Sequence, residues 1–370
     1  MTGFDLRAWE LVCYTFIFIF GVVGNFIVIL VIRKSRRLPK HRFRHVPFNV
    51  YLMNLAIVDL ALCAICLPVY IMGTSSFPHP TGVNGDVLCK LVTGNLPQFW
   101  LAGVSIYILV IISFERHYSI TRPFQSRMRV ATWKTYVYIG IAWFFGFLRE
   151  IPVLVGIRYT AINATIGTSC YYWPSKTTNI FVFSILFLTQ YVFPSIVFLV
   201  NFSRTTKHIR RLDKTLKLGI QDERERIKTV KGKKRSIRIV LIVLLVFLLF
   251  WTPNNIMYFL LQIGKNSDVV WSSDVYQMGI ILGFSSSSMN PIIYAFQSKE
   301  FRKNCANVFR QFIHFDKDRR KQTDKRRMNF KVIEKKANKR RFQEFVTSFE
   351  TEINSDVDFE VGPRRENVVI

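Results

Sequence analysis

Negative charge is scarce in this sequence of 370 residues, because 24 Asp and Glu stand against 51 Lys and Arg. Charge of either sign is absent from five long apolar stretches, which are 11–32, 91–114, 177–203, 239–264 and 275–298. Two more stretches come close, since 46–77 holds only Asp59 and 135–157 holds only Arg149 and Glu150. A helix of about 20 apolar residues crosses the hydrocarbon core of a bilayer. The seven stretches therefore predict seven transmembrane helices and exclude an ordinary water-soluble domain.

Signatures of catalysis are also missing from the sequence. It has no His and Cys residues clustered at metal-ligand spacing, no Gly-rich loop that would cradle phosphate, and no nucleophile motif. We therefore expect no enzyme. The two halves show no internal repeat, which argues against a transporter, and no span has the polar stripe of a channel pore. A transporter is kept as a distant alternative.

The basic residues alternate with the spans. Of the 51 Lys and Arg, 45 lie in the segments 33–45, 116–134, 204–238 and 299–370. Because basic loops stay on the cytoplasmic side of a membrane, this predicts a multi-pass plasma-membrane protein with an extracellular N-terminus and a cytoplasmic C-terminus. A nucleic-acid-binding protein would instead gather its charge on one soluble face. We expect this charge to meet anionic membrane lipid and a cytosolic partner, and not nucleic acid.

The expected fold class is an all-α membrane protein with a short amphipathic helix after span seven. Phe301, Val308 and Phe312 have the near-helical spacing of such a helix on the inner leaflet. The Lys- and Arg-dense stretch 316–341 lacks apolar periodicity and predicts disorder. The predicted parts are an extracellular N-terminus (1–9), a seven-transmembrane bundle (10–298), the amphipathic helix (299–313) and a disordered cytoplasmic tail (314–370).

Asp59 lies in the middle of a span, where an ionisable group is costly and marks a candidate functional site. Asn25 and several hydroxyl and amide side chains lie at similar depth. Carboxylate, hydroxyl and amide oxygens suit a small hard cation. The sequence therefore predicts a sodium site made by Asp59, Ser105, Ser286, Ser287 and Asn290, while a plain polar contact between helices is the alternative.

Short motifs follow one another along the spans in a fixed order. They are Gly24-Asn25, Asn54 to Asp59, Glu115-Arg116-His117, Trp143, Pro194, Phe247, Phe250-Trp251-Thr252-Pro253, Asn290-Pro291-Ile292-Ile293-Tyr294 and Phe301-Arg302. In this order they resemble the rhodopsin-like (class A) family of G-protein-coupled receptors, in its neuropeptide-receptor-like branch, over about residues 10–313. The resemblance implies a seven-helix bundle that binds an extracellular ligand and activates a heterotrimeric G protein.

The resemblance also implies roles for single residues. Arg116 would hold the inner helix ends closed at rest and meet the G protein when active, while Phe247 would relay a shift of Trp251 beneath the ligand. Tyr294 would swing inward on activation. The implied activation switch comprises Glu115, Arg116, Phe247, Trp251, Pro253, Asn290, Pro291 and Tyr294. Cys89 would form a disulfide with Cys170 and tie the second outer loop over the pocket.

Three departures from the family pattern lie near the inner ends of the spans. The usual Asp-Arg-Tyr triplet ends here in His117, which keeps the charge pair. Phe202 takes the place of a usual Tyr, so no hydroxyl can reach Arg116 from that position. Lys233 stands where some members carry an acidic partner for the arginine. We therefore expect that inner lock to be absent.

Two positions narrow the class of ligand, one in span three and one in span seven. Gln98 lies five helical turns before Arg116 and faces the same side, in the outer half of the bundle. Amine receptors of the resembled family carry Asp there, so Gln98 argues against an amine. Opsins need a Lys in span seven, where this sequence has none and places Phe284. The candidate ligand-binding residues are Asn95, Gln98, Phe99, Gln190, Trp251, Asn254, Asn255, Tyr258 and Tyr276.

Amides and phenols suit backbone-like groups, and aromatic walls suit apolar side chains. We therefore favour a short extracellular peptide as ligand over a lipid or another small non-amine molecule. Arg149 and Glu150 either pair with each other or meet a charged ligand group. Asn163 begins a glycosylation sequon in an outer loop. Hydroxyl residues at the acidic end of the tail would recruit arrestin once phosphorylated, namely Thr347, Ser348, Thr351 and Ser355.

Overall fold

The computed structural model describes the membrane bundle and parts of the tail. The described residues are 7–35, 47–74, 80, 82–122, 132–161, 168–172, 176–218, 223–263, 274–297, 301–303, 305–308, 310, 327–329, 331 and 333–348. Two compact units are present, Met1–Cys305 and Ala306–Ile370. The bundle belongs to the first unit.

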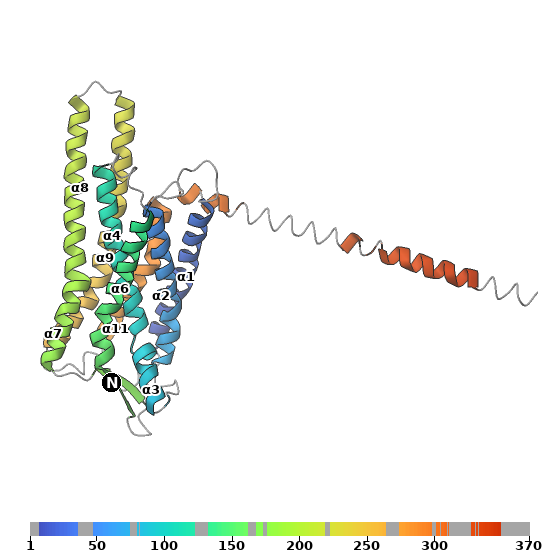
Figure 1. The fold of residues 1–370 in the computed structure, drawn as a ribbon, viewed down its shortest axis with the longest axis horizontal. Helices are drawn as coiled ribbons and strands as arrows, with labels where there is room; N and C mark the ends of the chain where they lie inside the picture. Colours follow the sequence, from blue (N-terminus) through green and yellow to red (C-terminus); the bar gives the residue numbers. More distant parts are fainter. Residues whose placement is uncertain are drawn as a thin grey trace, which may run out of the picture. The chain divides into compact units, whose positions relative to one another are not determined.

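The first unit is built from seven helical crossings (Figure 1). The fifth crossing consists of two helices joined by a five-residue π-helical turn, η2 (Leu188–Val192). The crossings are α1 (Ala8–Ser35), α2 (Pro47–Met72), α4 (Leu96–Thr121), α6 (Thr132–Gly156), α7 (Lys176–Phe187) with α8 (Phe193–Leu218), α9 (Glu223–Ile263) and α11 (Asp274–Gln297). A short helix α3 (Gly82–Leu88) and a π-helical turn η1 (Cys89–Thr93) precede α4.

Five described helical stretches are long and apolar enough to cross a membrane, and they lie in the first five crossings. In α9 the apolar part is the shorter stretch Leu241–Met257, which follows a strongly charged beginning. In α11 the serines Ser285–Ser288 and Asn290 interrupt the apolar sequence. The helices agree with the seven predicted spans.

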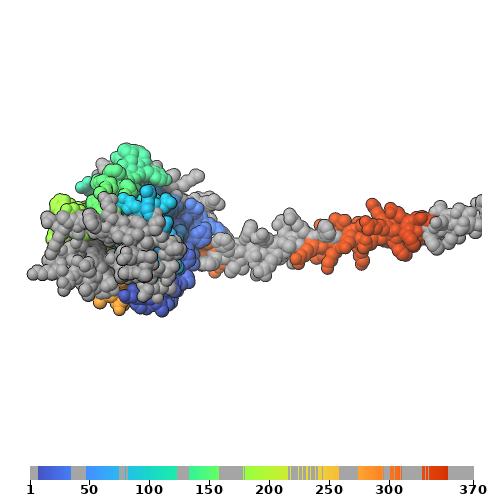
Figure 2. Space-filling model, turned by 90° about the horizontal axis from the view of Figure 1, so that it is seen from below, coloured from blue at the N-terminus to red at the C-terminus, as the bar shows by residue number. Residues whose placement is uncertain are grey.

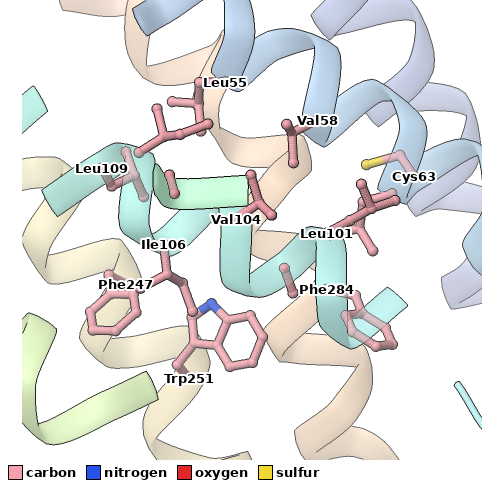
Figure 3. Packing of buried hydrophobic residues seen from close by; sticks show 14 of the residues in the cluster. Leu55, Val58, Cys63, Leu101, Val104, Ile106, Leu109, Phe247, Trp251 and Phe284 are labelled. Carbon is pink, nitrogen blue, oxygen red and sulfur yellow. The ribbon is translucent and has the colours of Figure 1, made fainter. Parts of the chain in front are cut away.

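Apolar packing between the crossings forms the core. The side chains of Leu55 and Val58 in α2 and of Val104 and Ile108 in α4 are fully buried. Figure 3 shows residues of α2 and α4 converging with Trp251 of α9 and Phe284 of α11. Large apolar side chains also cover the outside of the bundle, as bilayer-facing helices require. On α6 they include Trp133, Phe144, Phe145 and Val155.

The all-α prediction holds for the bundle but missed a β-hairpin. β1 (Ile157–Ala161) pairs antiparallel with β2 (Thr168–Tyr172), so that Ile157 lies opposite Tyr172 and Tyr159 opposite Cys170. Both strands contact η1. β-branched and aromatic residues favour strands, but these five-residue runs are too short to stand out in sequence. The hairpin marks one end of the bundle, called here the hairpin end.

The chain is helical again after α11. Residues 301–303, 305–308 and 310 are helical, Phe301 packs against the cluster of α1 and α2, and Arg302 donates from Nη1 to the carbonyl of Ala295 at 3.1 Å. The location of this helix on the inner leaflet stays a prediction.

The tail differs from the predicted disorder over residues 333–348, which form a helix with exposed side chains. Ala, Lys, Arg, Glu and Gln have high helix propensity. The prediction of disorder rested on the high charge of this segment and not on its helix propensity.

Candidate functional site

A buried polar centre joins three helices at Asp59, whose side chain is fully buried in α2. Ser105 of α4 donates from Oγ to Asp59 Oδ1 at 2.8 Å, and Asn290 of α11 donates from Nδ2 to Oδ2 at 2.7 Å. Ser287 lies within hydrogen-bonding reach of the same carboxylate. The structure therefore brings together four of the five residues predicted to hold sodium.

The fifth residue, Ser286, faces another partner. Trp251 of α9 donates from Nε1 to Ser286 Oγ at 3.1 Å, and Ser286 donates to the carbonyl of Gly283 at 2.7 Å. Ser286 therefore connects the polar centre to the tryptophan predicted to lie beneath the ligand, instead of reaching Asp59.

Pro291, which lies inside α11, explains how α1 joins the polar centre. Proline has no N–H, so the carbonyl four residues earlier, that of Ser287, lacks its helical donor. Asn25 of α1 donates from Nδ2 to this carbonyl at 3.2 Å and to the carbonyl of Gly21 at 2.9 Å. Gly24 permits the approach, because a Cβ there would lie 3.0 Å from the Pro291 ring.

A cavity of about 20 Å³ separates the polar centre from Trp251. This volume suffices for about one water-sized occupant. The predicted sodium ligands other than Asp59, which are Ser105, Ser286, Ser287 and Asn290, form the polar part of its wall. The lining residues are Ala102, Ser105, Ile106, Leu109, Val243, Val246, Phe247, Trp251, Ser286, Ser287 and Asn290.

Aromatic contacts connect the cavity to α8. The ring of Phe247 meets that of Phe198 edge-on, with centroids 5.5 Å apart, and stacks with that of Tyr191 at 6.2 Å. The Tyr191 hydroxyl lies 2.5 Å from Thr252 Oγ1. Trp251 and Phe247 are almost completely buried, and both line the cavity. Pro253 lies two residues beyond Trp251 inside α9.

Arg116 lies toward the end of the bundle opposite the hairpin. Its guanidinium carbon is 3.3 Å from the centroid of the Phe48 ring in α2, and its buried Nε has no hydrogen-bond partner in the described ranges of the chain. Arg116 is thus held by a cation–π contact, whereas the resemblance alone had not pointed to Phe48. Lys233 is part of α9, but its side chain lies outside the described residues.

His117, next to Arg116, joins α4 to α8. Its Nδ1 lies 2.7 Å from Thr205 Oγ1, and Thr205 donates to the carbonyl of Asn201 at 2.6 Å. Asn201 donates from Nδ2 to Ser113 Oγ at 2.9 Å. Phe202 supplies no hydroxyl here, as predicted, but Thr205, almost one turn later on α8, supplies one that was not predicted.

Toward the hairpin end, three of the predicted ligand residues lie at the start of α4. Asn95 precedes α4 in a left-handed conformation, with φ of 63°, and accepts at Oδ1 a hydrogen bond from Gln98 Nε2 at 3.2 Å. Gln98 is 2% exposed, and its Oε1 has no hydrogen-bond partner within the part of the chain that the structure describes. The Phe99 ring packs against that of Phe284, with centroids 5.5 Å apart.

The other predicted ligand residues come from three further helices. In α9, Asn254 is buried and its Oδ1 has no hydrogen-bond partner among the residues described. Asn255 donates from Nδ2 to the carbonyl of Trp251 at 2.8 Å. Gln190 in η2 and Tyr276 in α11 are buried. The side chains of Tyr258 and Tyr294, and Asn163 altogether, lie outside the described residues.

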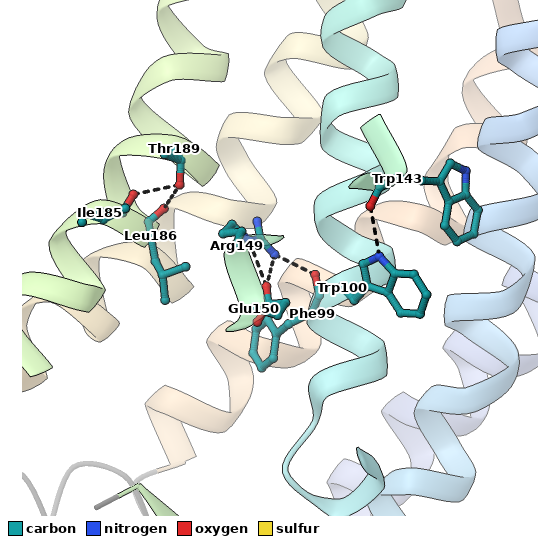
Figure 4. A network of polar contacts seen from close by, with 8 residues as sticks. All are labelled: Phe99, Trp100, Trp143, Arg149, Glu150, Ile185, Leu186 and Thr189. Carbon is teal, nitrogen blue, oxygen red and sulfur yellow. Dashed lines mark hydrogen bonds and ion pairs between the residues drawn. The ribbon is translucent and has the colours of Figure 1, made fainter. Parts of the chain in front are cut away.

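Arg149 and Glu150 form a buried ion pair with each other (Figure 4). Arg149 donates from Nε to Glu150 Oε1 at 2.9 Å, and its Nη2 bonds both Glu150 Oε1 and the carbonyl of Phe99. The guanidinium needs the space left by Gly103, where a Cβ would lie 2.6 Å from Nη2. Of the two readings of this pair, the structure supports internal pairing.

A second charged cluster, which the sequence reasoning missed, ties α1, α2 and α11 together near the hairpin end. Tyr70 donates to Glu10 Oε2 at 2.6 Å, and the Tyr70 ring stacks on that of Tyr14. Arg7 pairs with Glu10 at 3.8 Å and with Asp274. A Glu in the first turn of an apolar span was the only sequence signal for this cluster.

Cys89 is fully buried and disulfide-bonded. Cys170 lies in β2, a strand that contacts η1. The predicted pairing of the two cysteines stays a prediction, because the Cys170 side chain lies outside the described residues. Cys13, Cys63, Cys66 and Cys305 are free.

Residues 24–294 match the family described as 7 transmembrane receptor (rhodopsin family). The chain belongs to this family. It is therefore a multi-pass membrane receptor and not an enzyme, and the seven-helix bundle is confirmed.

Several receptors with similar sequences are named after peptides. Galanin receptor type 1 of Homo sapiens is 27% identical over 83% of this chain and 83% of its own length. Neuropeptide Y receptor type 6 of Mus musculus is 26% identical over 80% of this chain and 78% of its own. The pyroglutamylated RF-amide peptide receptor of Rattus norvegicus is 22% identical over 78% of this chain, a match that spans only 66% of that receptor.

Proposed function

We propose that this receptor binds a short extracellular peptide among its helices and activates a heterotrimeric G protein. The observation that supports a peptide ligand is that two buried amide oxygens, Gln98 Oε1 and Asn254 Oδ1, have no hydrogen-bond partner among the described residues. A buried acceptor left unpaired costs about 1–3 kcal/mol. A ligand that supplies N–H donors recovers this cost, and a peptide backbone or a terminal carboxamide is rich in them. The names of the galanin, neuropeptide Y and RF-amide receptors support the same ligand class.

The hairpin end faces the outside in this proposal. Disulfides persist in oxidising surroundings, and Cys89, next to the hairpin, is disulfide-bonded. The opposite end carries the basic extensions of α8 and α9, which the positive-inside rule places in the cytosol. The N-terminus is then extracellular and the tail cytoplasmic. A Cys89–Cys170 bond would fix β2 over the mouth of the pocket, and Asn163 between the strands would be glycosylated.

The signal would pass from the peptide through Trp251 to the polar centre. A displaced Trp251 ring disturbs its bond to Ser286, the cavity below, and the packing of Phe247 on Phe198. The donor set at Asp59 fits sodium, with one carboxylate, the hydroxyls of Ser105 and Ser287, and the Asn290 amide. Sodium there would hold α2, α4 and α11 in the resting arrangement.

At the cytoplasmic end, Arg116 would leave Phe48 and meet the G protein, with Tyr294 moving toward it. Phosphorylation of Thr347, Ser348, Thr351 and Ser355 would add the negative charge that recruits arrestin.

The test uses cells that carry a promiscuous G protein and a calcium reporter. Pools of amidated peptides, amines and lipids are applied to the wild type and to Arg116→Ala at equal surface level. We expect a response to peptides that Arg116→Ala lacks. Gln98→Leu combined with Asn254→Leu should raise the effective peptide concentration about tenfold or more, since two hydrogen bonds are lost, while Asn255→Leu serves as a control because its amide bonds Trp251.

A response to lipids or other non-amine small molecules alone would replace the peptide with the second candidate ligand class. A response to amines alone would contradict the role given to Gln98. A retinal ligand is excluded because α11 contains no lysine, although the Gq-coupled rhodopsin of Mizuhopecten yessoensis is 28% identical over 78% of this chain.

A further inference from the structure

The helix at 333–348 presents its charge and its aromatic rings together. Five Lys and Arg stand against two Glu over 333–348, which gives a net charge of +3. Every side chain of 333–348 is exposed, and Figure 2 shows these side chains standing out along the visible face of the helix. The Phe342 and Phe345 rings are 69% and 67% exposed. Exposed aromatic rings beside concentrated positive charge indicate a surface for an anionic partner.

Helical geometry sorts these side chains into faces. Phe342, Phe345 and Val346 are spaced i, i+3 and i+4, so they share one face. Lys335 and Lys339 precede Phe342 by seven and three residues and continue the same face toward the N-terminal end. Ile333 precedes Phe342 by nine residues and points to the opposite side. The result is a short apolar edge with basic residues beside it.

This arrangement favours a flat anionic surface over a protein groove. A helix that enters a groove carries apolar anchors along several turns, whereas here the apolar residues of the shared face occupy only 342–346. Basic side chains with a few aromatic residues are typical of helices that lie in the headgroup layer. Residue 333 follows the end of α11 at Gln297 by only 36 residues, so the membrane that holds the bundle is always within reach.

We propose that residues 333–348 form a binding site for the anionic phospholipid headgroups of the cytoplasmic leaflet. Lys335 and Lys339 contact phosphates, and Phe342, Phe345 and Val346 enter the interface between headgroups and acyl chains. An isolated helix of this length is marginal in water, so the lipid surface also stabilises the helix. The site rests on the cytoplasmic orientation of the tail given under the proposed function.

Hydrogen–deuterium exchange of the full chain in lipid nanodiscs tests the site. One set of discs contains phosphatidylcholine alone, and the other adds phosphatidylserine. Amide exchange in 333–348 should be about tenfold slower or more with phosphatidylserine, because each of several basic residues strengthens the attraction. High salt should remove the difference.

Matched variants separate this site from helix formation alone. Phe342→Gln should weaken the protection, while Ile333→Gln, on the opposite face, should keep it. Replacing Lys335 and Lys339 with Gln keeps helix propensity and should abolish the dependence on phosphatidylserine.

Equal exchange in the two kinds of disc would overturn the proposal. Protection that appears only with an added calcium-sensor protein would overturn it as well, in favour of a protein partner. Because this measurement needs neither peptide nor G protein, its failure leaves the receptor assay to be judged by itself.

Discussion

The buried pair of Arg149 and Glu150 offers a sharp test of the packing between α4 and α6. The perturbation is Glu150→Gln, which removes the charge and keeps the shape. In the native chain the two side chains are only 4% and 5% exposed, so water screens them little. Glu150 Oε1 accepts from both Nε and Nη2 of Arg149. The substitution therefore leaves a guanidinium buried without its counter-charge.

The expected loss of unfolding free energy follows from the charge that remains when one partner of the ion pair is removed. Removing one partner of a buried ion pair costs about 3–5 kcal/mol, because the remaining charge stays desolvated. Gln keeps one neutral acceptor, so we expect the lower end of this range, about 3 kcal/mol. Replacing both residues together, as Arg149→Met with Glu150→Leu, removes the charge and the unpaired donor at once. That double variant should be as stable as the wild type or more stable.

Thermal unfolding of the purified receptor in detergent measures these differences. A thiol-reactive dye reports unfolding, since Cys63 and Cys66 are at most 1% exposed in the fold. Glu150→Gln should label at a clearly lower temperature than the wild type, and the double variant should not. If the single and the double variant unfold alike, the reasoning about an uncompensated charge is refuted, and only lost packing would remain.

Three further predictions concern the polar centre, the inner end and the segment after α11. Sodium in place of choline should raise the unfolding temperature of the wild type, because sodium at ten times its dissociation constant adds about 1.4 kcal/mol to the free energy of unfolding. Asp59→Asn should lose this shift and Ser286→Ala should keep it. A shift that Asp59→Asn retains would contradict the sodium site. Thr205→Val should lower the free energy of unfolding by about 1–2 kcal/mol in the same assay, because His117 loses its partner. Thr206→Val should not, because the buried Thr206 hydroxyl has no partner among the described residues. Equal losses in the two variants would refute the role of Thr205. Burial raises the pKa of the Cys305 thiol, so its thiolate fraction at neutral pH is smaller than that of an exposed cysteine. Maleimide labelling followed by mass spectrometry should find slow alkylation of Cys305 that accelerates as the pH rises toward the raised pKa. Labelling as fast as that of a cysteine added to the tail would contradict this prediction.

Much of the fold could be predicted from the order of charged and uncharged residues. Stretches without charge define the spans because a bilayer core tolerates few unpaired charges. The short hairpin was missed because runs such as Ile157–Ala161 carry too little periodicity to stand out. The helix at 333–348 was missed because its charge argued for disorder while its residues favour helix locally.

The candidate site divides in the same way. The sequence by itself determined which side chains are out of place in an apolar span, so Asp59, Asn290 and the pair Arg149 and Glu150 could be named from position alone. Which of them touch was decided only by the tertiary structure. Contacts between helices depend on rotation and depth, which sequence spacing within one helix does not fix. For this reason Ser286 turned out to bond Trp251 instead of Asp59, Arg116 lies on Phe48, and His117 found Thr205 on another helix.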